Sequence, residues 1–432
     1  MRTSAARRCD RSAASRASSI PLKTCGSWSA DDDGRRAMTM EGWILAGQSN
    51  MEGSAPLDDP ATDRVDDTRV MSFTSAGEWE VAREPLHRTW ESYTPVHSIL
   101  HRRNPHSGAE GITDAEMAER ERRTQFRGAG LGLAFGKARA DATGGRVALV
   151  PAAHGGTSLN QWMPGSEGEE RSSPRTLYGS LLDRVARART RPDFVLRGVL
   201  WYQGESDANP SDSPTYARRW ADWIAAVRDD LDAPDLEVLA VQIGRFVGTV
   251  SAPSQTERDW DRVREAQRLV AQRTEGVRCT SAIDLGLCDD VHVDASGSTR
   301  LGIRLATMVD APEAGPDVSR VEVSTPRIDG YVRLRVVTTG VTGAWTAGPL
   351  PGFRLTDAEG QGIPGIDVVD AHRDPRRPSD IEILCTPFPR EPREFHVSYG
   401  LGYDPVCRAV DDRDLPLPTF GSQPVRGVDH LR

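Results

Sequence analysis

The chain carries five short apolar runs with segments of helical periodicity between them. The runs show little alternation of apolar and polar positions, which is typical of strands buried on both faces of a parallel sheet. They are Trp43–Ala46, Arg146–Pro151, Gly198–Tyr202, Leu236–Ile243 and Val277–Ile283. The helical segments are Leu131–Ala140, Leu177–Arg189, Tyr216–Leu231, Val263–Gln272 and Thr299–Val309. Strands and helices that alternate in this way predict a three-layer α/β/α domain around a parallel five-stranded sheet.

The pattern changes after residue 310. The segment Asp310–Asp317 has the Pro- and Gly-containing composition of a linker. Beyond it the period of the apolar positions becomes two, and Gly- and Pro-rich turns separate the runs Val318–Val323, Tyr331–Val337, Ile381–Leu384 and Phe395–Tyr399. We therefore expect a first domain over residues 38–310, a linker over 311–317 and a small C-terminal β-sandwich module over 318–432.

The first 37 residues fit neither pattern. They are rich in Arg, Ser and Ala, and their best apolar run, Ile20–Leu22, is far shorter than the roughly 7 to 15 apolar residues of a secretory signal. Two interpretations remain open: a disordered extension, or a start codon placed too early, with Met38 and Met40 just before the first strand. We leave residues 1–37 out of the predicted fold. Since no export signal is recognisable, we expect a cytoplasmic location.

Composition and charge limit the kinds of partner that the chain can bind. The chain has 432 residues, of which 38% are hydrophobic and 27% charged, with a net charge of -9. An acidic chain of this kind argues against nucleic acid as a partner, because phosphate binding needs a basic face. No run approaches the roughly 20 apolar residues that span a bilayer. The six cysteines lack the short paired spacing of a zinc site, so we expect free thiols and no metal.

Polar residues that suit ester hydrolysis follow several of the predicted strands. Ligands of an open parallel sheet bind beyond the carboxyl ends of its strands, so these positions are the first to inspect. Ser49 follows the first strand in Gly47-Gln48-Ser49-Asn50-Met51 and could act as a nucleophile. The pair Gly155-Gly156 follows the second strand, directly after His154, and could offer backbone N–H donors. Gln203 follows the third strand, with Glu205 close behind, and could donate from its amide to an oxyanion.

An Asp/His pair follows the fifth strand. In Asp289-Asp290-Val291-His292 a carboxylate three residues before the histidine could fix the tautomer of its ring and leave the other nitrogen for a serine. Asp289 is the expected acid, and Asp290 is an alternative.

Each of these motifs has an ordinary structural interpretation when it is taken alone. Ser49 and Asn50 suit a helix N-terminus, the glycine pair suits a tight turn, and Gln203 or His154 suits a turn-stabilising contact. The joint arrangement is more specific, because a nucleophile, further oxyanion donors and a base all fall at strand ends of one sheet. It predicts a serine hydrolase.

These segments resemble the SGNH hydrolase superfamily and, within it, the sialate O-acetylesterases and carbohydrate esterase family 6. The likeness spans residues 41 to about 309. It lies in Leu45–Met51, Gly155–Ser158 with Trp162, Trp201–Ser206, Asp289–His292 and the helix segment Val263–Gln267. A looser likeness to the end of sialate O-acetylesterases lies in Tyr399–Cys407 and Asp414–Phe420.

The resemblance implies a flavodoxin-like SGNH domain that hydrolyses acetyl esters on sugars without a cofactor. Matched residue by residue, it makes Ser49 the nucleophile, Asp289 and His292 the acid and base, and Ser49, Gly156 and Gln203 the oxyanion hole. Further residues near the motifs are candidates for substrate binding: Gln48, Asn50, His154, Glu205 and Arg264. The expected partner is an acetylated carbohydrate.

Two other functions stay open at this point. One is a non-catalytic carbohydrate-binding protein on an esterase fold, against which the intact set of site residues argues. The other is an esterase for lipids or acyl carriers, which would need an apolar groove, whereas Met51–Phe126 is polar. The sequence does not identify the sugar.

Overall fold

The structure is a computed structural model of the chain. It describes residues 39–104, 111–124, 127–248, 256–311, 315–328, 331–358, 360–387 and 394–427. The expected N-terminal extension, residues 1–37, lies outside the described residues, as does part of the expected linker.

A seven-stranded sheet forms the centre of the first domain, in the order β4-β3-β6-β1-β7-β8-β9. All neighbouring strands run parallel except β4, which is antiparallel to β3. The chain adds strands on one side of β1 and then on the other, so the direction of sheet growth reverses at β1. The strand bounds are Met40–Gly47 (β1), Val70–Phe73 (β3), Trp79–Val81 (β4), Arg146–Pro151 (β6), Phe194–Tyr202 (β7), Glu237–Gln242 (β8) and Val277–Ser281 (β9).

The α/β class and all five predicted strands are confirmed, but the predicted strand count was too low. The two missed strands, β3 and β4, have 4 and 3 residues and stand at one edge of the sheet. Such short segments carry too few positions for a period to show. A further pair, β2 (Ala55–Pro56) and β5 (Arg127–Ala129), forms a separate two-stranded ribbon.

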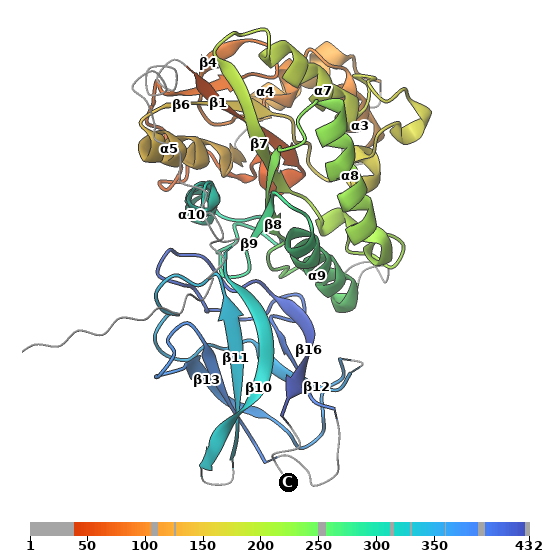
Figure 1. Cartoon of the computed structure of the whole chain (residues 1–432). Helices are drawn as coiled ribbons and strands as arrows, with labels where there is room; N and C mark the ends of the chain where they lie inside the picture. Colours follow the sequence, from red (N-terminus) through yellow and green to blue (C-terminus); the bar gives the residue numbers. More distant parts are fainter. Residues whose placement is uncertain are drawn as a thin grey trace, which may run out of the picture.

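Helices cover both faces of the sheet (Figure 1). Helices α5 (Gly132–Thr143) and α10 (Ala295–Met308) pack together on one side, whereas α7 (Leu177–Ala188), α8 (Tyr216–Asp230) and α9 (Glu257–Arg273) lie on the other. Shorter or peripheral helices are α2 (Ser49–Glu52), α3 (Val96–Arg103), α4 (Asp114–Thr124) and α6 (Leu159–Trp162). Within the described residues, no helix has the length and hydropathy to cross a membrane.

All five predicted helices are present, and two begin earlier than predicted. Helix α9 starts after Thr256, whose hydroxyl accepts the N–H of Asp259 at 3.2 Å. Helix α10 starts after Asp294, whose carboxylate accepts the N–H of Gly297 at 2.6 Å. These caps satisfy backbone donors at the helix ends and add a polar first turn that apolar periodicity does not reveal.

The C-terminal module is built of β-strands alone in its described part. Its strand order is β12-β15-β16-β10-β11-β14-β13, and buried side chains from both halves of this order, such as Leu334, Ile383, Val397 and Phe420, share one hydrophobic core. The four predicted strands are present. The bounds are Asp317–Ile328 (β10), Tyr331–Thr339 (β11), Phe353–Thr356 (β12), Val368–Arg373 (β13), Ile381–Cys385 (β14), His396–Tyr399 (β15) and Phe420–Arg426 (β16).

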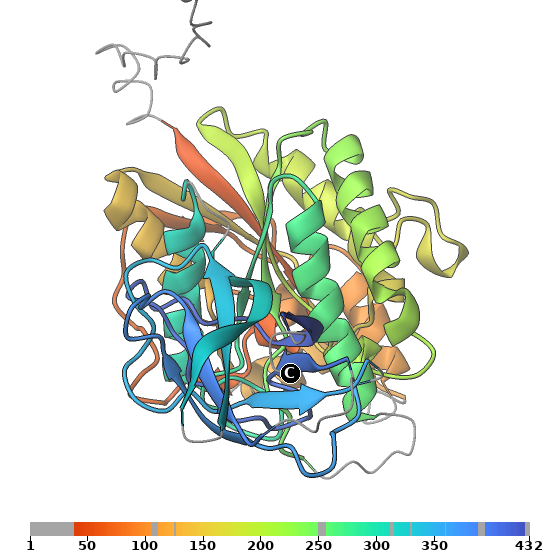
Figure 2. The same ribbon diagram turned by 60° about the horizontal axis from the view of Figure 1, so that its bottom comes forward.

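The module stands below α9 and α10 at one end of the α/β domain, and Figure 2 brings it to the front. Polar contacts join the two. The Gln242 amide at the end of β8 donates to the Thr419 carbonyl at 2.9 Å and accepts the Thr419 N–H at 2.8 Å. Arg304 of α10 contacts Asp414 at 3.2 Å. The four cysteines in the described residues are free thiols.

Candidate active site

The end of β1 presents Ser49 above the sheet. Gly47 has a φ of 138°, and a Cβ at this position would lie 2.1 Å from the carbonyl oxygen of Tyr202 on β7. Only glycine therefore fits between these two strand ends. The N–H of Gln48 donates to the same Tyr202 carbonyl at 2.9 Å, and helix α2 begins at Ser49. The close contact of two strand ends thus fixes the backbone that carries the serine, whose side chain is only partly buried.

His292 meets Ser49 from a loop 243 residues further along the chain. Its Nε2 lies 2.8 Å from the Ser49 Oγ, which is hydrogen-bond distance. Its Nδ1 lies 2.9 Å from each carboxylate oxygen of Asp289. With the Nδ1 proton directed to Asp289, the free Nε2 lone pair points at the serine hydroxyl.

Asp289 is held in its ionised form. Its Oδ1 accepts the backbone N–H groups of Val291 at 3.1 Å and His292 at 2.9 Å, and Arg127 of β5 pairs with Oδ2. Partial burial alone raises the pKa of this carboxyl, but the hydrogen bonds from His292, Val291 and Arg127 together hold the pKa of Asp289 below its ordinary value. Asp290, the alternative acid, is exposed. The geometry selects Asp289 as the partner of His292.

The glycine pair lies beside the serine. A Cβ on Gly155 would lie 3.5 Å from the Ser49 Cβ, and Gly156 has a φ of 68° with open space around it. Within the described residues, the backbone N–H groups of Ser49 and Gly156 have no protein acceptor, so both remain able to bind an oxyanion.

Glu52 holds this glycine pair, and the sequence analysis missed it. Its carboxylate accepts the N–H of Gly155. Burial raises the pKa of Glu52 to about 7, against the lowering effect of that hydrogen bond. The one available sequence signal was its position three residues after Ser49, which places it on the same turn of a short helix.

A cavity of about 530 Å³ opens beside the glycine pair, and Ser49 and His292 are not among the residues that line it. Its walls come from α2, α3, the loop after β6 and α6. They include Glu52, His101, Arg103, His154, Gly156 and Gln161. Pockets of roughly 300–1,000 Å³ are typical of small-molecule sites.

The comparison with protein families decides the identity of the α/β domain. Residues 39–311 match the family described as carbohydrate esterase, sialic acid-specific acetylesterase. The chain belongs to this family. The protein is therefore a carbohydrate esterase, a hydrolase of carboxylic ester bonds, and the resemblance to sialate O-acetylesterases is confirmed.

Two relatives show how far the likeness extends. The esterase is 28% identical over 270 residues to a plant protein described as a probable carbohydrate esterase of Arabidopsis thaliana, covering 61% of this chain and 88% of the relative. The crystal structure of a carbohydrate acetylesterase from Xanthomonas citri aligns with a TM-score of 0.59 at 20% identity, covering 88% of this chain and 80% of the other. That share exceeds what residues up to 311 could supply, so the likeness of fold reaches into the C-terminal module.

Gln203 of the esterase does not have the geometry of an oxyanion donor. It is fully buried, and its Nε2 lies 2.6 Å from Asp207 Oδ2, 3.1 Å from the Thr157 carbonyl and 3.3 Å from Gln48 Oε1. Both amide hydrogens therefore have acceptors inside the protein. The structure therefore does not support the predicted role of Gln203 as an oxyanion donor. The physical reason is the buried carboxylate of Asp207, which accepts from the Gln203 amide and which no local sequence pattern places beside it.

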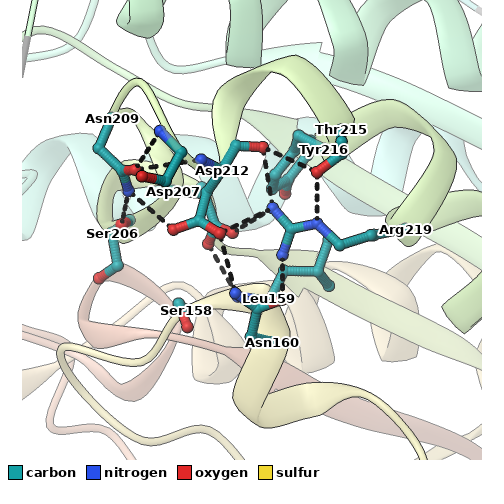
Figure 3. A network of polar contacts seen from close by, with 12 residues as sticks. Ser158, Leu159, Asn160, Ser206, Asp207, Asn209, Asp212, Thr215, Tyr216 and Arg219 are labelled. Atoms are coloured by element: carbon teal, nitrogen blue, oxygen red, sulfur yellow. Dashed lines mark hydrogen bonds and ion pairs between the residues drawn. The ribbon is translucent and has the colours of Figure 1, made fainter.

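Asp207 is itself anchored by a network around Arg219 (Figure 3). Arg219 of α8 contacts Asp207 at 2.9 Å and the Asn160 amide oxygen at 2.7 Å, while the N–H of Leu159 donates to Asp207 at 2.8 Å. The network ties the loop after β7 to α6 and fixes the orientation of Gln203.

Three of the predicted substrate-binding residues are buried under the site. Gln48 is 4% exposed and its Oε1 accepts the N–H of Gly204 at 3.2 Å. Asn50 and Glu205 are 7% and 6% exposed and contact each other. All three residues follow strand ends, as predicted. Their side chains, however, are buried between the loops that follow β1 and β7, so almost none of their surface is exposed to a sugar.

Arg264 lies away from the site. Its guanidinium donates to the carbonyl oxygens of Gly244, at the end of β8, and of Gly402 in the C-terminal module, and it is fully buried. The predicted substrate role was wrong, because this arginine joins the two parts of the esterase.

His154 lines the cavity, and its Nδ1 lies 2.9 Å from Nδ1 of His97 on α3. In the described part of the chain, no group of three or more His, Cys, Asp or Glu stands in a position to hold a metal.

Proposed function

We propose that the protein is a serine O-acetylesterase of acetylated sugars, with Ser49 as nucleophile and His292 as general base. The observation that carries the proposal is the contact of 2.8 Å between Ser49 Oγ and His292 Nε2, with Asp289 at 2.9 Å behind the ring. A serine hydroxyl is a weak nucleophile at neutral pH, and a base at this distance activates it.

The first half of the reaction forms an acetyl-enzyme. Ser49 Oγ attacks the acetyl carbonyl while His292 Nε2 takes its proton, and Asp289 stabilises the resulting imidazolium. The negative charge on the carbonyl oxygen is bound by the N–H groups of Ser49 and Gly156, two donors that are free in the described structure. When the intermediate collapses, His292 returns the proton to the sugar oxygen, and the sugar leaves as an alcohol.

The second half regenerates the enzyme. A water molecule gives a proton to His292 and attacks the acetyl group on Ser49. The C–O bond to serine breaks, the serine oxygen recovers the proton from His292, and acetic acid leaves and ionises to acetate in solution. His292 therefore moves the proton in both halves of the reaction.

The cavity supports a sugar as the alcohol part of the ester. The cavity lies beside Gly155 and Gly156, next to Ser49, and its volume of about 530 Å³ is large enough for a sugar ring whose acetyl group reaches out to the serine. The lining residues His101, Arg103 and Gln161 supply hydrogen-bonding groups suited to hydroxyls. Sialic acid, with its carboxylate, is one candidate, and xylan and other acetylated glycans are further ones.

The test is the hydrolysis of an aryl acetate and of acetylated sugars by Ser49→Ala. We expect kcat to fall by at least ~10³-fold with an unchanged melting temperature, since the nucleophile is removed and a partly exposed hydroxyl contributes little to folding. Ser211→Ala, a change at an exposed serine, is the matched control and should keep full activity. Undiminished turnover by purified Ser49→Ala would refute the assignment. Acetate release from a panel of acetylated sialic acids, xylo-oligosaccharides and other glycans then identifies the sugar.

A further inference from the structure

Asn50 is the residue next to the nucleophile, and its side chain reaches the loop that carries the base. Its Oδ1 accepts the N–H of Val293 at 3.0 Å, and its Nδ2 lies 3.3 Å from the Val291 carbonyl. Val291 and Val293 are the two residues that flank His292. Asn50, itself the chain neighbour of Ser49, is therefore hydrogen-bonded to both chain neighbours of His292.

Glu205 sets the orientation of the Asn50 amide. Its Oε1 accepts from Asn50 Nδ2 at 2.8 Å, so the amide nitrogen faces Glu205 and the amide oxygen faces Val293. Glu205 is 6% exposed, and its Oε2 has no hydrogen-bond partner within the described residues. A buried carboxylate costs free energy unless it is well paired, so stability alone does not explain its presence here.

The loop around His292 needs such a support because the central sheet does not hold it. After β9 ends at Ser281, the segment up to Asp294 has an isolated bridge between Leu287 and Val293 and a bond from the Cys288 N–H to the His292 carbonyl at 2.8 Å. From outside the loop, Arg127 pairs with Asp289, and the Val247 N–H donates to the Asp290 carbonyl. None of these contacts reaches the turn of Ser49. Besides the contact between Ser49 and His292 themselves, the Asn50 bonds tie the His292 end of the loop to that turn.

We infer that Asn50 is a positioning residue that holds the His292 imidazole in register with Ser49, and that Glu205 fixes the Asn50 amide for this task. The inference rests on the proposed function and adds two residues that touch neither substrate nor the reacting atoms. A displacement of a reacting group by about 1 Å costs on the order of 10²-fold in rate. The loss of Asn50 should therefore lower kcat more than it raises KM.

The experiment is a double-mutant cycle between positions 50 and 205. Asn50→Asp keeps an acceptor for the Val293 N–H but sets two carboxylates against each other, and we expect kcat to fall by ~10²-fold with KM for an aryl acetate changed less than threefold. Glu205→Gln still offers Oε1 to Asn50, and we expect kcat within about threefold of wild type. When both substitutions are combined, the new amide at position 205 donates to the new carboxylate at position 50, and we expect at least tenfold recovery over Asn50→Asp.

Thermal unfolding and the rate of organophosphate labelling of Ser49 accompany each variant. A merely structural role would lower the melting temperature and leave kcat per folded molecule unchanged, and this result overturns the inference. So does an Asn50→Asp enzyme within threefold of wild-type kcat, or a folded double variant no faster than Asn50→Asp. If Asn50→Asp yields no folded protein, Glu205→Ala decides: a fall in kcat of about tenfold supports the inference, and a fall below threefold overturns it.

The failure of this inference differs from the failure of the proposed function. If wild type hydrolyses acetyl esters, Ser49→Ala does not, and the cycle shows no coupling, the serine mechanism stands and the role of Asn50 falls. If Ser49→Ala retains activity, the proposed function itself falls.

Discussion

The two sides of the candidate active site are held in different ways. Ser49 stands at the end of β1, a strand with neighbours on both sides, and the backbone contact of Gly47 and Gln48 with Tyr202 fixes its turn. His292 stands in a loop after β9, the last strand of the sheet, and remote side chains and loops hold it. These supports include Asn50, Arg127 and the Val247 N–H, which donates to the Asp290 carbonyl at 2.8 Å.

The difference shows which half of the site tolerates change. The position of the nucleophile follows from the strand order, so only substitutions that break the sheet should move it. The position of the base depends on several separate side chains, and we expect the loss of one of them to affect the sheet less than it affects the loop. We therefore expect the activity of this enzyme to be most sensitive, outside the reacting groups, to substitutions that surround the His292 loop.

The largest effect on the His292 side should come from Asp289→Asn. The amide cannot stabilise the imidazolium and favours the wrong tautomer of His292, so we expect kcat to fall by ~10²–10⁴-fold. Steady-state hydrolysis of an aryl acetate measures this, with circular dichroism to check the fold. Asp290→Asn is the matched control and should stay within about threefold of wild type. If the two variants lose activity equally, the assignment of Asp289 as the partner of His292 is incorrect.

A smaller effect should follow the removal of Arg127. This residue pairs with the carboxylate oxygen of Asp289 from another element, with side chains 36% and 30% exposed, and partly exposed pairs contribute little to stability. We expect Arg127→Ala to lower kcat by about three- to tenfold and to leave the melting temperature nearly unchanged. Arg197→Ala, which removes a surface ion pair to Asp310 on another part of the domain, is the control. An Arg127→Ala enzyme as active as wild type would show that Asp289 needs no second support.

The last prediction concerns Glu52, on the nucleophile side, and its effect is measured as a change in melting temperature rather than in activity. The pKa of Glu52 is raised from 4.5 to about 7 by burial, so the folded protein binds its proton more tightly than the unfolded chain does. This group stabilises the fold fully below about pH 4.5, and the contribution is lost as the pH rises towards 7.

Glu52→Gln keeps an acceptor for the Gly155 N–H and removes the titration. A pKa raised from 4.5 to about 7 corresponds to roughly 3 kcal/mol, so the melting temperature of Glu52→Gln relative to wild type should rise by about 5–10 °C between pH 5 and pH 8. Melting curves of both proteins across this range provide the comparison. Glu170→Gln, at an exposed position of the same domain, is the control. Parallel curves for wild type and Glu52→Gln would mean that Glu52 does not titrate as described.

The sequence could place Ser49 at the end of a strand because strand ends are local features. Gly47-Gln48-Ser49 directly follows an apolar run, and its place above the sheet follows from the rule that ligands bind at carboxyl ends of parallel strands. The Asp289–His292 pair was also predicted, since its internal contacts span only three residues.

The remaining contacts depend on tertiary packing that no local pattern contains. Arg127 comes from a three-residue strand, Asp207 turns the Gln203 amide away from the substrate, and Arg264 reaches the C-terminal module instead of the cavity. A motif gives the residue type and the strand end, but neighbouring segments decide where a side chain points. This is why Gln48, Asn50 and Glu205 were correctly placed near the site and incorrectly assigned to substrate.

The central claim is that His292 activates Ser49, and the rate of labelling by a fluorophosphonate tests it most directly. Peptide mass analysis should find one adduct, on the peptide that contains Ser49, and His292→Ala should slow its formation by at least ~10³-fold while the protein stays folded. Labelling of another residue, or labelling of Ser49 at the same rate without the imidazole, would contradict the account.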